Sequence, residues 1–89
     1  MADRAEPIGY AAAVERVRLV IAYYSRAIHQ ERSSTSPDPA RLEELTSHRR
    51  ACVADRQALD DADEEVIART AEEYGARYLR LTSAEPGRS

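Results

Sequence analysis

The chain has 89 residues, 33% charged and 43% hydrophobic, which fits one globular domain and excludes the composition of a disordered chain. Its net charge is −3, and no segment is basic enough to predict a general nucleic-acid or anionic-membrane surface. The longest apolar run, Leu19 to Tyr24, is far shorter than the ~18 residues that a membrane span needs.

The first predicted helix covers residues 7–31, where Pro7 suits the first turn because its missing N–H costs no hydrogen bond. Its apolar residues follow alternating spacings of 4 and 3, the heptad spacing of helices that pack together: Tyr10, Val14, Val17, Ile21, Tyr24 and Ile28. A second apolar line, of Ala13, Val20 and Ala27, runs beside it. A face this wide predicts that the helix contacts two neighbouring helices.

The second predicted helix covers residues 39–59. Asp38 precedes a proline and therefore resists the α conformation, so its carboxylate can cap the first free N–H groups. The apolar line of this helix consists of Leu42, Leu45, Cys52, Val53 and Leu59. That line is weak, because Arg49 and Arg56 occupy inward positions from which only their aliphatic stems can cover apolar surface.

The third predicted helix covers residues 61–82 and follows an acidic break at residues 60–64. Asp61 and Glu64 have the spacing of a capping box, which predicts Asp61 as the N-cap. The heptad line of the helix consists of Ile67, Ala71, Tyr74, Tyr78 and Leu81. Two pairs have the favourable order for i,i+4 ion pairing: Glu65–Arg69 and Glu73–Arg77.

Gly75 lies in the middle of the third predicted helix, where glycine costs about 1 kcal/mol relative to alanine. We therefore expect another helix to approach closely there.

Together the patterns predict an all-α fold, an antiparallel three-helix bundle of up-down-up order. The alternative is a helical hairpin with helices two and three nearly continuous, which would dimerise. We expect residues 1–6 to be flexible and residues 83–89 to be disordered.

Composition also indicates source and compartment. Every basic residue is Arg, and Lys, Asn, Phe and Trp are absent, which suggests a GC-rich genome such as that of an actinobacterium. The N-terminus has no signal-peptide core, and the single cysteine, Cys52, excludes an internal disulfide. We therefore expect a cytoplasmic protein.

Few residues suggest chemistry. His48 and Cys52 lie one helical turn apart, with Glu44 and Asp55 on the same face, and all four are metal-ligand types. One cysteine and one histidine do not fill a tetrahedral zinc site, so we expect no metal and no cofactor. Nowhere does the spacing predict a nucleophile, a base and an orienting group together. The sequence therefore predicts no catalytic residues and no enzyme.

A local basic patch on the second predicted helix contains His48, Arg49, Arg50 and Arg56. One interpretation is a contact with phosphate or another anion. The other, which we favour, is that these arginines pair with the acids of the third helix, since residues 59–89 carry a charge of −4.

The leading hypothesis from the sequence is a non-enzymatic interaction or regulatory protein that acts through its helix faces on a protein partner or on itself, as a homodimer. The weak apolar line of the second helix leaves surface for a second copy. The candidate interface consists of Tyr10, Val14, Val17, Ile21, Tyr24, Ile28, Tyr74 and Tyr78. The alternative function is a regulator that binds a nucleotide or nucleic acid through the arginines of the second helix.

Overall fold

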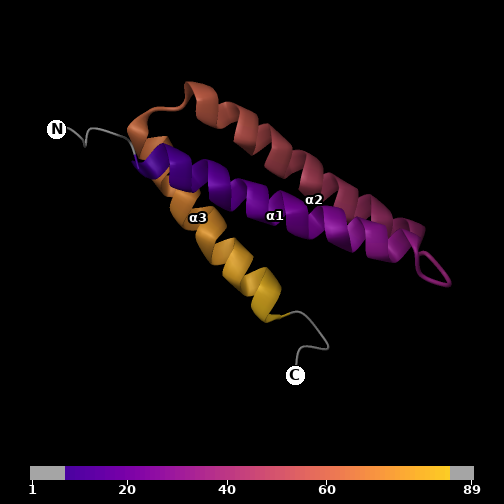
Figure 1. Ribbon diagram of the computed structural model, residues 1–89. Coiled ribbons are helices and arrows are strands. Elements are labelled where there is room, and N and C mark those ends of the chain that lie inside the picture. Colours follow the sequence, from indigo (N-terminus) through magenta and orange to yellow (C-terminus); the bar gives the residue numbers. More distant parts are fainter. Residues whose placement is uncertain (1–7, 85–89) are drawn as a thin grey trace.

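Three helices make up the computed structural model, which describes residues 8–84 (Figure 1). Helix α1 spans Ile8–Arg32, and α2 spans Pro39–Ala58 and continues into a short 3₁₀ turn, η2, at Leu59–Asp61. Helix α3 spans Glu64–Ser83. The predicted all-α three-helix bundle is confirmed. The predictions for the two chain ends, including Pro7, fall largely or wholly outside the described residues.

Helix α1 lies in the middle of the bundle (Figure 1). Helix α2 runs back along it in the opposite direction, and α3 turns back again and runs in the general direction of α1 (Figure 1). Away from the turn that joins them, α2 and α3 diverge, and the molecule is long and thin, 55 × 30 × 16 Å. The up-down-up order of the bundle is therefore also confirmed.

The chain breaks between η2 and α3 because Ala62 and Asp63 are both extended, with ψ of 152° and 175°. This break rules out the alternative in which helices two and three are nearly continuous. The predicted N-cap of α3 is wrong: Asp63, not Asp61, caps the helix, and its carboxylate accepts a hydrogen bond from the N–H of Val66 at 3.0 Å. Asp61 is instead part of η2, the turn that keeps Leu59 buried.

The start of α2 is as the sequence predicts. Asp38 is extended, with φ −97° and ψ 112°, and its carboxylate accepts a hydrogen bond from the N–H of Ala40 at 3.0 Å. Pro39 follows in the first turn, where its missing N–H costs nothing. The N–H of Asp38 donates in turn to Glu31 Oε2 at 2.9 Å, which closes the loop between α1 and α2.

The core is built mainly by α1, which supplies half of the buried side chains. These side chains are Ala13, Val17, Val20, Tyr24 and Ile28 from α1, Leu45 and Cys52 from α2, Leu59 from η2, and Ala71 and Tyr74 from α3. Both apolar lines of α1 contribute, as expected for a helix that packs on two neighbours. Helix α2 contributes two residues, which fits its weak apolar line.

Candidate functional surfaces

Most of the residues that the sequence predicts as an interface lie inside this chain. Four of them are buried in the core: Val17, Tyr24, Ile28 and Tyr74. The other four are half-buried and pack against that core: Tyr10, Val14, Ile21 and Tyr78. A heptad line packs the same way against a helix of its own chain as against a second copy. The predicted interface residues are therefore largely engaged in contacts within the chain, and half-buried members such as Tyr78 still reach the surface.

The four residues predicted to contact an anion lie in three different surroundings. Arg49 and Arg50 line a shallow hollow of 310 Å³ on α2, with Thr46 and Val53. His48 faces away from it, toward α3. The helix therefore does not present the four side chains as one patch.

Arg56 is engaged in the last turn of α2. Its Nη1 donates to Asp60 Oδ1 at 3.2 Å, and the hydroxyl of Tyr10 donates to the same oxygen at 2.9 Å. These bonds from Tyr10 and Arg56 lower the pKa of Asp60. The expectation that the arginines of α2 pair with acids of α3 is wrong for residues 8–84, where no such ion pair forms. Glu73 and Arg77 do pair within α3, at 3.8 Å, whereas Glu65 and Arg69 do not.

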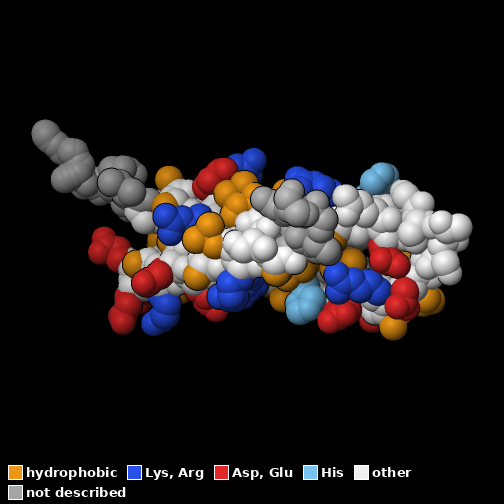
Figure 2. Space-filling view, turned by 90° about the horizontal axis from the view of Figure 1, so that it is seen from below, with side chains coloured by type: hydrophobic (Ala, Val, Ile, Leu, Met, Phe, Trp, Pro, Cys, Tyr) orange, Lys and Arg blue, Asp and Glu red, His pale blue; other side chains and the backbone are white. Residues whose placement is uncertain are grey.

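Charges of both signs are interspersed on the face of the molecule that Figure 2 shows. Seen from below the view of Figure 1, Arg side chains alternate with Asp and Glu side chains, and hydrophobic patches emerge between them (Figure 2). This face carries no continuous basic stripe of the kind that tracks a nucleic-acid backbone.

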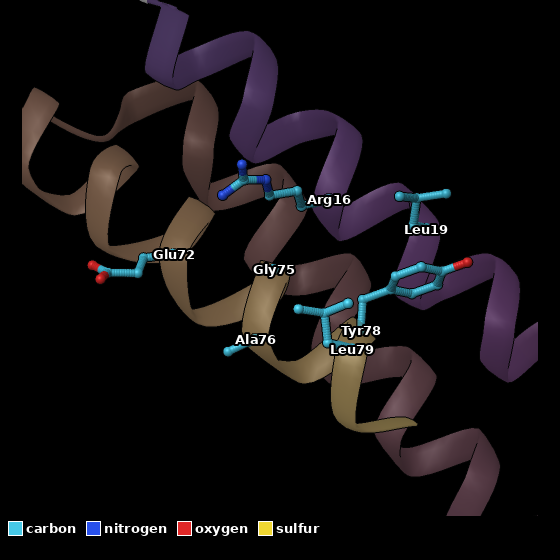
Figure 3. A pocket seen from close by; sticks show the side chains of 7 residues that line it. All are labelled: Arg16, Leu19, Glu72, Gly75, Ala76, Tyr78 and Leu79. Carbon is cyan, nitrogen blue, oxygen red and sulfur yellow. The ribbon is translucent and has the colours of Figure 1, made fainter. Parts of the chain in front are cut away.

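One surface of interest is a groove of 460 Å³ between α1 and α3 (Figure 3). We call it the α1–α3 groove, and its lining residues are Arg16, Leu19, Glu72, Gly75, Ala76, Tyr78 and Leu79. Leu79 is the most exposed large hydrophobic residue in residues 9–84, at 65%, and Leu19 is 36% exposed. The Tyr78 ring reaches across from α3 toward α1 near Leu19 (Figure 3). The groove is therefore mostly apolar, with charges only at one end.

The floor of the α1–α3 groove depends on Gly75. A Cβ at this position would lie 3.2 Å from Arg16 Nη1 and 3.4 Å from Arg16 Cδ. Because glycine lacks that atom, the Arg16 side chain lies across α3 and donates from Nη1 to the carbonyl of Ala71 at 3.0 Å. The close approach expected at Gly75 is thus made by the side chain of α1.

A second surface is a cleft of 380 Å³ between α2 and α3. We call it the α2–α3 cleft, and its lining residues are Tyr24, His48, Ala51, Asp55, Arg77, Arg80 and Leu81. Tyr24 comes from α1, and its ring stacks on that of His48, with centroids 5.4 Å apart and planes at 15°. Burial, together with the neighbouring Cys52 thiol, raises the pKa of Tyr24.

Polar contacts hold the inner end of the α2–α3 cleft. The hydroxyl of Tyr74 donates to Asp55 Oδ2 at 2.6 Å, and Arg77 Nη1 donates to Cys52 Sγ at 3.7 Å. The Arg77 guanidinium also lies 4.4 Å from the centre of the Tyr74 ring, a cation–π contact. Burial and the bond to Asp55 raise the pKa of Tyr74, so its hydroxyl stays protonated. Burial lowers the pKa of Arg77, but the nearby Tyr74, Cys52 and Glu73 raise it more.

In the described part of the chain, the side chains of metal-ligand type lie too far apart to form a metal site. Cys52 is buried and free, and its environment lacks the exposure that a reactive thiolate needs. No three residues of the His, Cys, Asp or Glu types gather there closely enough to hold a metal ion. Between Ile8 and Ser83, no helix has the length and apolar character required to cross a membrane.

The heptad spacing did not predict the exposed residues of the α1–α3 groove or of the α2–α3 cleft. Leu19 and Leu79 fall outside the heptad lines, and an apolar residue off those lines was the available signal. Arg80 was not singled out, because no spacing rule relates it to His48 or Tyr24.

Comparisons with protein-family models, with curated proteins and with solved structures find no match to this chain.

Proposed function

We propose that this protein is a small non-enzymatic interaction or regulatory protein that self-associates through the α1–α3 groove. The observation that carries this proposal is Leu79, which is 65% exposed beside an apolar hollow. A large aliphatic side chain left in water next to an apolar groove is typical of a contact site rather than of a monomer's surface.

The shape of the groove favours a second copy as its occupant. It carries both a protruding apolar side chain, Leu79, and a hollow beside Gly75 and Ala76 (Figure 3). In a two-fold dimer the same patch is used twice, so a patch with a projection and a hollow is complementary to itself. Leu79 of each copy would pack on the small residues of the other and on the aliphatic stem of Arg16.

The charges at the end of the groove support the same occupant. Arg16 comes from α1 and Glu72 from α3, so the rim holds one charge of each sign. Two copies that meet on this patch bring together equal numbers of positive and negative groups. A strongly acidic or strongly basic partner would leave one of these charges repelled.

The expected strength of the contact follows from the area that Leu79 exposes. Burying that area stabilises the dimer by about 1–2 kcal/mol per copy. Removing both leucines therefore costs the dimer about 2–4 kcal/mol, which raises the dissociation constant by about 30- to 1,000-fold.

Sedimentation equilibrium of the wild type and two variants tests the proposal. We expect the wild type to dimerise with a dissociation constant in the micromolar range and Leu79→Glu to be monomeric at the same concentrations. Val66→Glu is the matched control, because Val66 is also an exposed apolar residue of α3, at 37%, and does not line the groove. Circular dichroism should show the same helix content for all three proteins, since both side chains lie at the surface.

Two results would overturn the proposal. One is a wild type that remains monomeric at several hundred micromolar. The other is equal loss of association in Leu79→Glu and Val66→Glu, which would mean that any added negative charge on α3 separates the copies.

A further inference from the structure

The α2–α3 cleft has a chemistry different from that of the α1–α3 groove. Its wall carries two guanidinium groups, Arg77 and Arg80, and the imidazole of His48. Its remaining surface is aromatic and aliphatic, from Tyr24, Ala51 and Leu81, with one acid, Asp55. A few polar donors among apolar side chains are the usual composition of a small-molecule site, and 380 Å³ lies within the usual size range.

We propose that the α2–α3 cleft binds a small organic carboxylate, with its charge at Arg80 and Arg77 and its apolar body against Tyr24, Ala51 and Leu81. Guanidinium groups bind carboxylates through paired, charge-assisted hydrogen bonds. This inference concerns a different surface from the proposed self-association.

Arg80 is the side chain that makes the cleft receptive to an anion. Within residues 8–84 it forms no ion pair, in contrast to Arg18, Arg41, Arg56 and Arg77. It lies one turn of α3 beyond Arg77, so the two guanidinium groups can approach the same ligand. Arg77 is held in place by Cys52 and by the Tyr74 ring, so less of its freedom is lost when a ligand binds.

The charge of the cleft favours a single negative charge on the ligand. Among the lining residues, Arg77 and Arg80 contribute two positive charges and Asp55 one negative charge, while Glu73, which pairs with Arg77 at 3.8 Å, lies outside the lining. Asp55 already accepts the Tyr74 hydroxyl at 2.6 Å through Oδ2. Its carboxylate still repels a second negative charge, so the cleft discriminates against dianions.

The aromatic floor of the cleft favours a planar body. The Tyr24 ring is fixed by burial and by its stack on His48, and it also meets the Tyr23 ring edge-on at 5.5 Å. A planar group can pack beside the exposed His48 ring, which the buried Tyr24 ring already holds in place, so few side chains have to be newly ordered and the cost of binding stays low. We therefore use benzoate as the probe, because it joins one carboxylate to one ring.

The experiment is a titration of the full chain with benzoate at constant ionic strength, followed by backbone amide chemical shifts in NMR spectra. We expect saturable shifts with a dissociation constant in the millimolar range at residues around His48, Asp55 and Arg80. Acetate, which lacks the ring, should bind more weakly, and benzyl alcohol, which lacks the charge, should not bind measurably.

A matched pair of variants on α2 locates the site. Ala51→Glu adds a carboxylate to the cleft wall and should weaken benzoate binding by at least about tenfold, because the added charge repels the ligand's own. Ala54→Glu makes the same change at another exposed alanine of α2 that lines none of the surfaces described above and should bind as the wild type does. Leu79→Glu should also bind benzoate normally, since Leu79 does not line the cleft.

Three results would overturn the proposal. The first is a set of shifts that does not saturate, and the second is a set centred on the hollow of Arg49 and Arg50. The third is equal weakening by Ala51→Glu and Ala54→Glu, which would show that only the overall charge of the protein matters.

Discussion

The two sides of α3, one facing α1 and the other facing α2, are held to the rest of the bundle in different ways. We call the side facing α1 the close edge and the side facing α2 the polar edge. Toward α1 the contact is close, because Ala71 and Gly75 are small and Arg16 lies across them with a bond to the Ala71 carbonyl. Toward α2 the hydrogen bonds come from long polar side chains, Tyr74 to Asp55 and Arg77 to Cys52. Where side chains are small the helices meet, and where they are long and polar the helices stand apart.

This difference explains why each edge leaves its own kind of surface. On the side facing α1, the small residues Ala71 and Gly75 pack against α1 and Leu79 stays exposed, so an apolar groove remains at the surface. The edge at α2 leaves a cleft with polar walls, since Tyr74, Asp55 and Arg77 act as spacers whose polar atoms satisfy one another. One helix thus presents two surfaces suited to chemically different partners.

The largest expected effect concerns Tyr74, which joins both edges. Its ring is 1% exposed and belongs to the core, while its hydroxyl reaches Asp55 on α2. Tyr74→Ala should lower the free energy of unfolding by about 3–5 kcal/mol, as for other large aromatic side chains in cores. Tyr74→Phe keeps the ring and should cost only about 0.5–1.5 kcal/mol. Urea unfolding followed by circular dichroism measures both values.

The ratio of the two losses in unfolding free energy tests whether packing or hydrogen bonding holds α3 in place. If Tyr74→Phe cost as much as Tyr74→Ala, the hydroxyl bond to α2 rather than the packing against α1 would hold α3 in place. Because Asp55 is exposed, water can replace the lost hydrogen bond, and we expect the smaller value.

The next effect concerns the close edge, at Gly75. In an Arg16→Ala background, Gly75→Ala should raise the free energy of unfolding by about 1 kcal/mol through its higher helix propensity. The three atoms nearest to the added Cβ all belong to Arg16, so this background removes the obstacle. In the wild type the gain should be smaller, because the Arg16 guanidinium, which donates to the Ala71 carbonyl, has to shift to make room for the added Cβ.

A double-mutant cycle over Arg16 and Gly75 gives the coupling directly. Additive effects would mean that the Arg16 side chain does not lie over Gly75 in solution, and the close edge would then need another explanation.

Much of the fold was predictable because it rests on local and periodic signals. The heptad lines of α1 and α3 and the cap at Asp38 identified three helices and their order. The cap of α3 was not predictable from the capping box at Asp61, because burial of Leu59 continues the preceding helix into η2 and moves the start of α3 to Asp63. Both Asp61 and Asp63 have side chains that can cap a helix, and tertiary packing rather than local sequence decided that Asp63 caps α3.

The candidate surfaces were less predictable than the fold. A heptad line shows that a face is buried, but it does not show whether the covering helix belongs to the same chain. Tyr24 and Tyr74 were therefore expected in an interface and lie in the core. The cleft that joins His48 to Arg77 and Arg80 depends on the angle at which α3 leaves α2, which no spacing within one helix encodes.

The smallest expected effect is a decrease in the free energy of unfolding at alkaline pH, caused by the ionisation of Tyr24 and Tyr74. The pKa values of Tyr24 and Tyr74 are raised in the folded chain, chiefly by burial, and in the unfolded chain both return to about 10. The stabilisation from the protonated hydroxyls is complete below pH 10 and is lost as the pH rises toward the folded-state pKa values. At pH 10 the loss is at most about 0.4 kcal/mol for each tyrosine, and it grows at higher pH.

Urea unfolding at several pH values between 8 and 11 measures this loss. Tyr74→Phe should depend less on pH than the wild type, since it has one fewer hydroxyl that ionises only on unfolding. Leu79→Glu, which changes only the α1 edge, should keep the wild-type slope. An unchanged slope in Tyr74→Phe would mean that the Tyr74 hydroxyl is open to solvent, and the polar edge of α3 would then be looser than its 2.6 Å contact with Asp55 implies.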